Sequence, residues 1–198
     1  TTAMTNIGLD YTVLGGRVSG TLDFYNKETK DMLYKYNVSS PPYQYNQLLA
    51  NGASMTNRGV EFMVNVVAVD QPDFSWTTNF NVAYNKNKIG SLDSNVDNLS
   101  ISERYEGTMY LEGWTAQTVS IVRPGLPIGT FYTYKYMGYD AEQQKTLYEN
   151  AAGEIVTIDK LKSPDDYQVV GSALPKVTFG WNNTFKYKRW DLNFFLRG

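Results

Sequence analysis

The sequence lacks most of the residue types that usually perform catalysis. There is no His and no Cys among its 198 residues, which excludes Ser-His-Asp triads, cysteine nucleophiles and thiolate or imidazole metal sites. Glycosidase chemistry would need two carboxylates held across a cleft. The candidates Glu103, Glu106 and Glu112 lie in a segment without any other catalytic signature. We therefore expect no catalytic residues and no enzyme.

Oxygen ligands for a metal ion are also poorly arranged. Asp159, Asp165 and Asp166 offer carboxylates of the kind that Ca²⁺ prefers, but their spacing matches no EF-type loop. We expect no metal site and no cofactor.

Aromatic and amide side chains are the remaining candidates for binding a ligand. An aromatic ring stacks on the C–H surface of a sugar or grips a peptide, and an amide offers both a donor and an acceptor to a polar solute. The candidate ligand-binding residues are Tyr105, Tyr110, Trp114, Tyr132, Tyr134, Asn79 and Asn81. The structural alternative is that the aromatic residues pack within their own loop and the asparagines hydrogen-bond to neighbouring protein groups.

Charge and hydropathy exclude two further classes of protein. The 18 basic and 20 acidic residues give a net charge of -2 and form no run of like charge, so nucleic acid is not an expected partner. No apolar run approaches the length of a transmembrane helix, and residues 1–10 lack the pattern of a signal peptide. Membrane insertion by β-strands remains open.

The elements that must position these side chains are strands. Apolar and polar residues alternate with a period of two, which is typical of strands with one apolar and one polar face. We predict an all-β fold of six antiparallel strands. Their approximate ranges are 7–13, 18–34, 60–68, 76–85, 177–187 and 190–196.

The connections between these strands alternate between short and long. The short turns are at Gly15-Gly16, Asp70 to Asp73 and Lys188-Arg189, whereas residues 37–54 and 91–174 form long connections. Short turns at one end and long loops at the other are the arrangement of outer-membrane barrels. Trp76, Tyr187 and Trp190 flank the short turns as an interfacial girdle would. A soluble β-sandwich with the same aromatics in its core satisfies the pattern equally well.

A series of short motifs resembles the SusC/RagA-type TonB-dependent transporters of the Bacteroidota outer membrane, in the second half of their barrel. The order of the motifs is more specific than any one of them. The motifs are Thr5-Asn6-Ile7-Gly8-Leu9-Asp10, Asp23-Phe24-Tyr25, Thr29-Lys30-Asp31-Met32-Leu33, Met55-Thr56-Asn57-Arg58-Gly59-Val60-Glu61-Phe62, Phe74-Ser75-Trp76, Asn85-Lys86-Asn87-Lys88-Ile89, Gly125-Leu126-Pro127-Ile128-Gly129-Thr130-Phe131-Tyr132, Phe179-Gly180 and Trp190-Asp191-Leu192. Family members often carry an acidic, glycine-containing loop where this sequence has residues 159–166.

The resemblance implies a transmembrane outer-membrane β-barrel with short periplasmic turns and long extracellular loops. Residues 1–198 would be part of the barrel domain, a fragment of a longer chain with a plug and about 22 strands, and residues 91–174 would be a long extracellular loop region. The implied function is TonB-dependent import of an oligomeric glycan or peptide across the outer membrane. The implied partners are a SusD-like surface lipoprotein, TonB through the missing N-terminal parts, and outer-membrane lipid.

Two alternative functions remain open, and the resemblance leads to two local expectations. The alternatives are a soluble secreted β-sandwich that binds carbohydrate or protein, and an adhesin-like barrel without import. The residues that we expect to face lipid are Ile7, Leu9, Tyr11, Val60, Phe62, Val64, Phe80, Val82, Val177, Phe179, Leu192 and Phe194. We also expect residues 125–138 to form a hairpin-like element inside the long loop, with Tyr132, Tyr134 and Tyr136 on the rim where the lipoprotein docks.

Overall fold

A computed structural model describes residues 1–94, 101–110 and 117–198. The chain divides into two compact units, which are described separately. The first unit contains residues 1–31, 54–87 and 175–198, and the second contains residues 32–53 and 88–174. Trp114 and Glu112 lie outside the described residues. Within the described residues, no helix is long and apolar enough to span a membrane.

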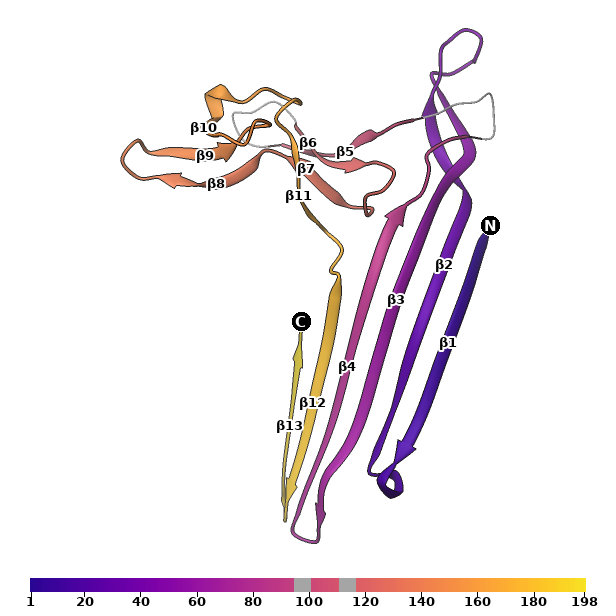
Figure 1. Cartoon of the computed structure of the whole chain (residues 1–198), viewed down its shortest axis with the longest axis vertical. Coiled ribbons are helices and arrows are strands. Elements are labelled where there is room, and N and C mark those ends of the chain that lie inside the picture. Colours follow the sequence, from indigo (N-terminus) through magenta and orange to yellow (C-terminus); the bar gives the residue numbers. More distant parts are fainter. Residues whose placement is uncertain (95–100, 111–116) are drawn as a thin grey trace. The chain divides into compact units, whose positions relative to one another are not determined.

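The first unit is built on a six-stranded antiparallel sheet with the strand order β1-β2-β3-β4-β12-β13. The strands are β1 (Thr2–Val13), β2 (Val18–Asn37), β3 (Gln47–Gln71), β4 (Phe74–Ile89), β12 (Val177–Tyr187) and β13 (Trp190–Arg197). Figure 1 shows these long strands side by side, and β2, β3 and β4 also contribute residues to the second unit. The predicted six antiparallel strands are confirmed.

The three short turns lie at one end of this sheet (Figure 1). The first turn is a 3₁₀ segment, η1 (Leu14–Gly16), in which Leu14, Gly15 and Gly16 all have positive φ. Positive φ at consecutive positions matches the right-handed twist of hairpin strands, and glycine adopts it without steric cost. The glycine pair therefore fixes the β1–β2 reversal and its register.

The two faces of the sheet differ in chemistry. Residues directly opposite each other in an antiparallel pair share a face, so the register assigns side chains to faces. Pairs on the apolar face include Ile7 with Phe24, Leu9 with Leu22, Val82 with Phe179, Phe80 with Trp181 and Phe185 with Leu192. Pairs on the polar face include Asn79 with Asn182, Thr77 with Thr184 and Lys186 with Asp191.

The second unit contains seven short strands in two sheets. A four-stranded sheet has the order β11-β7-β6-β5, and a three-stranded sheet has the order β10-β9-β8. The strands are β5 (Arg104–Met109), β6 (Gln117–Val122), β7 (Thr130–Thr133), β8 (Lys135–Asp140), β9 (Lys145–Glu149), β10 (Ile155–Thr157) and β11 (Gln168–Ser172), with a 3₁₀ segment η2 (Ile158–Lys160) after β10.

A small hydrophobic core lies in the second unit. Ala53, Ile89 and Leu92 form a buried cluster, against which Met32, Tyr34, Ile101 and Val122 pack. Every buried hydrophobic side chain among the described residues belongs to this unit. The first unit has no equivalent core in the part of the chain that the structure describes, so its sheet is not stabilised by a dry interior of its own.

The prediction of a loop over residues 37–54 was wrong in its extent. β2 continues to Asn37 and β3 already begins at Gln47, so only residues 38–46 connect them. Residues 47–53 do not follow the period of two seen further along β3, because Ala50 and Ala53 are both buried although an odd number of positions separates them. A regular strand therefore has an irregular sequence pattern here.

The prediction of a hairpin over residues 125–138 was also wrong. β7 pairs with β6 and β11, whereas β8 pairs with β9, so the two halves of the segment belong to different sheets. Only Tyr134 separates β7 from β8, and one residue is too few for a hairpin turn. The chain instead continues from one sheet into the other at this tyrosine.

Candidate functional site

The first candidate site is a recess on the polar face of the first unit. It has a volume of about 230 Å³, and Asn65, Asn79 and Asn182 contribute to its lining together with Thr77 and Thr184. These residues come from β3, β4 and β12, and the register places Asn79 directly opposite Asn182. The sheet thus concentrates amides and hydroxyls that lie far apart in the sequence.

Hydrogen bonds fix part of this recess and leave part of it free. Asn79 Nδ2 donates to Asn65 Oδ1 over 2.5 Å. By contrast, Asn182 Oδ1 is buried and accepts no hydrogen bond from the described residues. A buried amide oxygen without a partner costs free energy, which a ligand or a neighbouring domain that donates to it would recover.

Asn81 lies on the same polar face but not in the recess. It is directly opposite Gly180, and a Cβ at that glycine would lie 3.0–3.1 Å from the Asn81 amide atoms. The absence of a side chain at position 180 therefore makes room for the Asn81 amide. Of the two predicted asparagines, Asn79 lines the recess, whereas Asn81 occupies an exposed place beside it.

The second candidate site is a row of ring contacts in the second unit, which we term the tyrosine cluster. Its members, in order of contact, are Tyr105, Tyr132, Tyr167, Tyr134, Tyr148 and Tyr136. Consecutive ring centroids are 4.8–6.2 Å apart, the shortest distance being between Tyr134 and Tyr167. Most of these pairs are edge-to-face, which is a favourable geometry for aromatic rings.

One end of the tyrosine cluster contacts a half-buried ion pair between Arg123 and Glu103. Arg123 lies over the ring of Tyr132, 5.1 Å from its centroid, and its guanidinium is 2.7 Å from Glu103. Tyr105 donates its hydroxyl hydrogen to the same carboxylate over 2.9 Å. The hydrogen bond to Glu103, with a smaller contribution from burial, raises the pKa of Tyr105. Burial likewise raises the pKa of Tyr134, so both phenols are protonated donors at neutral pH.

The tyrosine cluster contains three of the five aromatic residues predicted to bind a ligand. Tyr105, Tyr132 and Tyr134 are members, while Tyr110 is 80% exposed and makes no ring contact with the described residues. Trp114 lies outside the described residues. The rings of the cluster contact one another, as the structural alternative expected, and the outermost of them, Tyr136, is 60% exposed.

Sequence reasoning missed three partners of this cluster. No sequence motif identified these residues, which are Arg123, Tyr148 and Tyr167. Each of them lies in a different segment of the chain from the ring that it contacts. The sequence offered one indication of these contacts: Tyr148 lies in the β-prone segment Lys145–Glu149, which predicts a strand at that position.

Three of the acidic residues considered above, Asp166, Glu103 and Glu106, make contacts within the second unit. Asp166 accepts hydrogen bonds from the backbone N–H groups of Ala151 (2.8 Å) and Lys162 (2.7 Å), which lower its pKa. Glu103 and Glu106 are each engaged with an arginine. No group of three or more carboxylates in the described residues is placed to hold a metal ion.

Long antiparallel strands, opposed polar and apolar faces and short turns at one end define a β-sheet of the membrane-barrel class. Residues 4–197 match the family described as TonB dependent receptor-like, beta-barrel, and the chain belongs to this family. The resemblance to SusC/RagA-type TonB-dependent transporters is thereby confirmed. The family is one of receptors and transporters rather than of enzymes.

Individual relatives agree with this assignment. TonB-dependent receptor P3 of Formosa agariphila is 29% identical over 215 residues, which cover 100% of this chain and 20% of that protein. TonB-dependent receptor SusC of Bacteroides thetaiotaomicron is 28% identical over 193 residues, which cover 97% of this chain and 18% of that protein. The chain therefore spans about a fifth of the length of these relatives.

Solved structures show the same fold. The RagAB peptide transporter superposes with a TM-score of 0.73 at 23% identity, over 99% of this chain and 20% of that chain. The RagAB peptide importer in its open-open state superposes with a TM-score of 0.74 at 22% identity, over 97% of this chain and 19% of that chain. The six strands of the first unit accordingly form an open sheet that corresponds to part of a larger barrel.

Proposed function

We propose that this chain forms part of the wall of a TonB-dependent transporter that imports an oligomeric glycan or peptide across the outer membrane. The observation that carries the proposal is the opposition of two faces on one sheet, apolar with exposed large side chains on one side and amide-rich on the other. A soluble sandwich would cover its apolar face, whereas a barrel wall exposes it to lipid.

In this proposal the polar face lines the lumen. The recess with Asn65, Asn79 and Asn182 then offers amide donors and acceptors either to the solute or to the plug that closes the lumen. The unpartnered Asn182 Oδ1 supports such a contact, because occupation of the recess by a donor would satisfy it. Transport would involve no covalent step; the lumen residues would bind and release the solute.

The second unit is proposed to be extracellular and to contact a SusD-like surface lipoprotein. Its support is the family assignment together with exposed aromatic and apolar side chains on β8 and β10. These are Tyr136 (60% exposed), Met137 (42%), Tyr139 (58%) and Ile155 (60%). Tyrosine is suited to such a surface because its ring is apolar and its hydroxyl stays hydrated.

Uptake by cells that carry the full-length protein tests the proposal. We expect import of a labelled oligosaccharide or oligopeptide to require TonB, and to fall in an Asn79→Leu/Asn182→Leu variant while the amount of protein in the outer membrane is unchanged. Val82→Ala, on the opposite face of β4, is the matched control. TonB-independent uptake, or recovery of the protein in buffer without detergent, would contradict the proposal and favour the soluble binding module.

The lipoprotein contact has a separate test. Tyr136→Ser/Tyr139→Ser should weaken co-purification of the lipoprotein with the full-length transporter, and Tyr110→Ser should not. Unchanged co-purification of the double variant would remove β8 from the proposed interface.

A further inference from the structure

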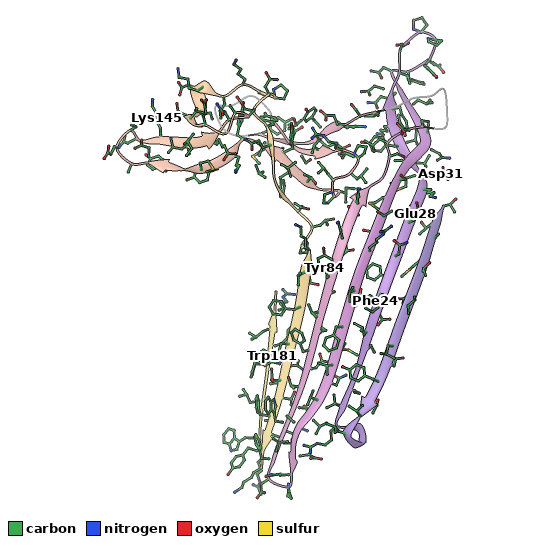
Figure 2. All side chains as sticks on the ribbon, viewed as in Figure 1. Phe24, Glu28, Asp31, Tyr84, Lys145 and Trp181 are labelled. Atoms are coloured by element: carbon green, nitrogen blue, oxygen red, sulfur yellow. The ribbon has the colours of Figure 1, made fainter. Side chains whose placement is uncertain are left out.

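The apolar face of the first unit ends at one level on four neighbouring strands. Counted away from the short turns, the last apolar residue on this face of each strand is followed, two positions along the strand, by a polar residue. These pairs are Ile7 and Thr5 on β1, Phe24 and Asn26 on β2, Val60 and Arg58 on β3, and Tyr84 and Lys86 on β4. All eight residues line one recess of about 350 Å³, and Figure 2 labels Phe24 and Tyr84 within the sheet.

The distance along the strands from the short turns to this recess matches the thickness of one bilayer core. β12 has 11 residues, and its register pairs them with β4 from Tyr187 opposite Phe74 to Val177 opposite Tyr84. A tilted β-strand needs about 9–11 residues to cross the hydrocarbon core. Tyr84 is thus the last residue of a membrane-length apolar stretch that begins at a short turn, and Lys86 follows it.

Two cations, Arg58 and Lys86, lie at this recess, and a hydrogen bond orients the first of them. Arg58 Nε donates to Asn26 Oδ1 over 2.7 Å, which orients the guanidinium along the boundary. This bond uses Nε alone, so both terminal nitrogens of the fork can donate to an acceptor that offers two oxygens. Within the described ranges, neither Arg58 nor Lys86 lies within 4.0 Å of a carboxylate.

The nearest acidic residue on the same face of β2 is already engaged. Glu28 (labelled in Figure 2) lies two positions beyond Asn26, and its carboxylate is 3.3 Å from Lys30 Nζ. The cations therefore have no anionic partner from this sheet. An anion from outside the chain would complete the pair, and the apolar residues below favour an anion that is attached to an acyl chain.

We propose that Arg58 and Lys86 bind the headgroup phosphate of an outer-leaflet lipid whose acyl chain lies on Ile7, Phe24, Val60 and Tyr84. This inference rests on the proposed placement of the sheet in the outer membrane. Arginine is suited to the phosphate because its fork donates two parallel hydrogen bonds, and lysine adds a point charge. The recess thereby differs from ordinary snorkelling, in which a cation only reaches water.

The test uses the full-length protein in detergent micelles and a titration with lipid A that carries phosphate, followed by native mass spectrometry. Two comparison ligands separate the possible sources of affinity: lipid A from which phosphate has been removed, and inorganic phosphate as a competitor. The variants are Arg58→Gln, Lys86→Gln and the double variant. Lys27→Gln is the matched control, because Lys27 is adjacent to Asn26 but points to the opposite face.

We expect the double variant to bind phosphorylated lipid A roughly tenfold to thirtyfold more weakly than the unmodified protein, since each interfacial cation contributes modestly to the attraction of an anionic lipid. Lys27→Gln should bind as the unmodified protein does. Equal binding of the dephosphorylated lipid would overturn the proposal and indicate snorkelling cations over an acyl-chain groove. Full competition by inorganic phosphate would overturn it in favour of a free-phosphate site.

Reconstitution into vesicles separates this failure from failure of the proposed function. If the protein inserts but the double variant retains full lipid binding, only the lipid site is refuted. If the protein does not insert, both the barrel placement and the lipid site are refuted.

Discussion

The two units of this chain differ in whether they bury aromatic and aliphatic side chains in a core of their own. In the first unit they stand exposed along the apolar face, with Ile7 at 69%, Leu9 at 60% and Leu192 at 61% of full exposure. In the second unit some of them are buried, with Ile121 at 0% and Leu92 at 2%, and several tyrosines contact one another, whereas Tyr136 and Ile155 stay exposed at 60%.

If the first sheet is placed in the membrane as proposed, this difference reflects two different solvents, lipid for its apolar face and water for the second unit. A strand that faces lipid gains nothing by hiding its apolar residues from hydrocarbon, so its stability depends on an unbroken backbone ladder and on the absence of charge from that face. A domain in water must bury apolar area against itself. The two units should therefore respond differently to the same kinds of substitution.

The largest expected effect is a charge on the apolar face of the first unit. Phe80→Arg should destabilise the full-length protein in a bilayer by about 2–4 kcal/mol, because Phe80 lies near the middle of the membrane-length stretch from Phe74 to Tyr84, where a cation is poorly solvated. The free energy of unfolding from vesicles of the full-length protein measures this. The control is Asn81→Arg, one residue away on the polar face. Equal losses for the two variants would contradict the assignment of the faces.

A somewhat smaller and local loss is expected in the tyrosine cluster. Tyr134→Ala removes ring contacts to both Tyr167 and Tyr148, and should cost about 2–3 kcal/mol because the site is only partly buried. Hydrogen exchange should increase in residues 117–172 and remain unchanged in β12 and β13. Tyr139→Ala, at an exposed position, is the control, and equal exchange in the two variants would show that the ring contacts carry no stability.

Acid should loosen the second unit through Asp166. Its pKa is lowered by hydrogen bonds from the Ala151 and Lys162 N–H groups, so its carboxylate stabilises the fold above the usual Asp pKa of about 3.9. That contribution is lost as the pH falls below this value through the lower folded pKa. In limited proteolysis of the unmodified protein, the rate of cleavage within residues 151–166 should therefore rise as the pH falls.

Asp166→Asn tests the cause of this acid response. The variant should already be cleaved faster at neutral pH, because one amide oxygen replaces two charged acceptors, and its acid-induced change should be smaller. Asp165→Asn is the control. An acid response of the same size in Asp166→Asn would assign the effect to other carboxylates.

The smallest expected effect concerns the ion pair between Lys135 and Glu149, whose nitrogen and oxygen are 2.8 Å apart. Lys135→Gln should destabilise the second unit by no more than about 1 kcal/mol, because the lysine is exposed and water screens the pair. The loss should shrink as salt is raised. A loss as large as that of Tyr134→Ala would mean that charge, rather than ring packing, holds the three-stranded sheet.

Alternation along the sequence was sufficient to predict the long sheet. A period of two assigns each side chain to a face without any knowledge of the partner strand, and the glycine pair and the Lys188-Arg189 turn mark reversals by local chemistry. The predicted lipid-facing residues Ile7, Val82, Phe179 and Leu192 are accordingly placed by the register on the apolar face. Whether that face meets lipid is a prediction for the Phe80→Arg experiment.

The second unit could not be predicted in the same way. Its strands have 3–6 residues, which is too short for a periodic signal, and the single residue Tyr134 between β7 and β8 gives no indication that the chain changes sheets. The sequence suggested tyrosines with a shared role, but their contacts with Tyr148, Tyr167 and Arg123 depend on how separate segments fold together.

The sequence by itself determined the all-β class, the two faces of the long strands, the absence of His- and Cys-based chemistry, and the family. The first three are properties of local spacing and composition, whereas the family follows from the resemblance of the ordered motifs. Only the tertiary structure decided that Asn79 lies opposite Asn182, about a hundred residues away, and that Arg58 and Lys86 line one recess with residues of two further strands. The physical reason is that pairing between strands distant in the chain sets register, and register rather than sequence distance decides which side chains meet.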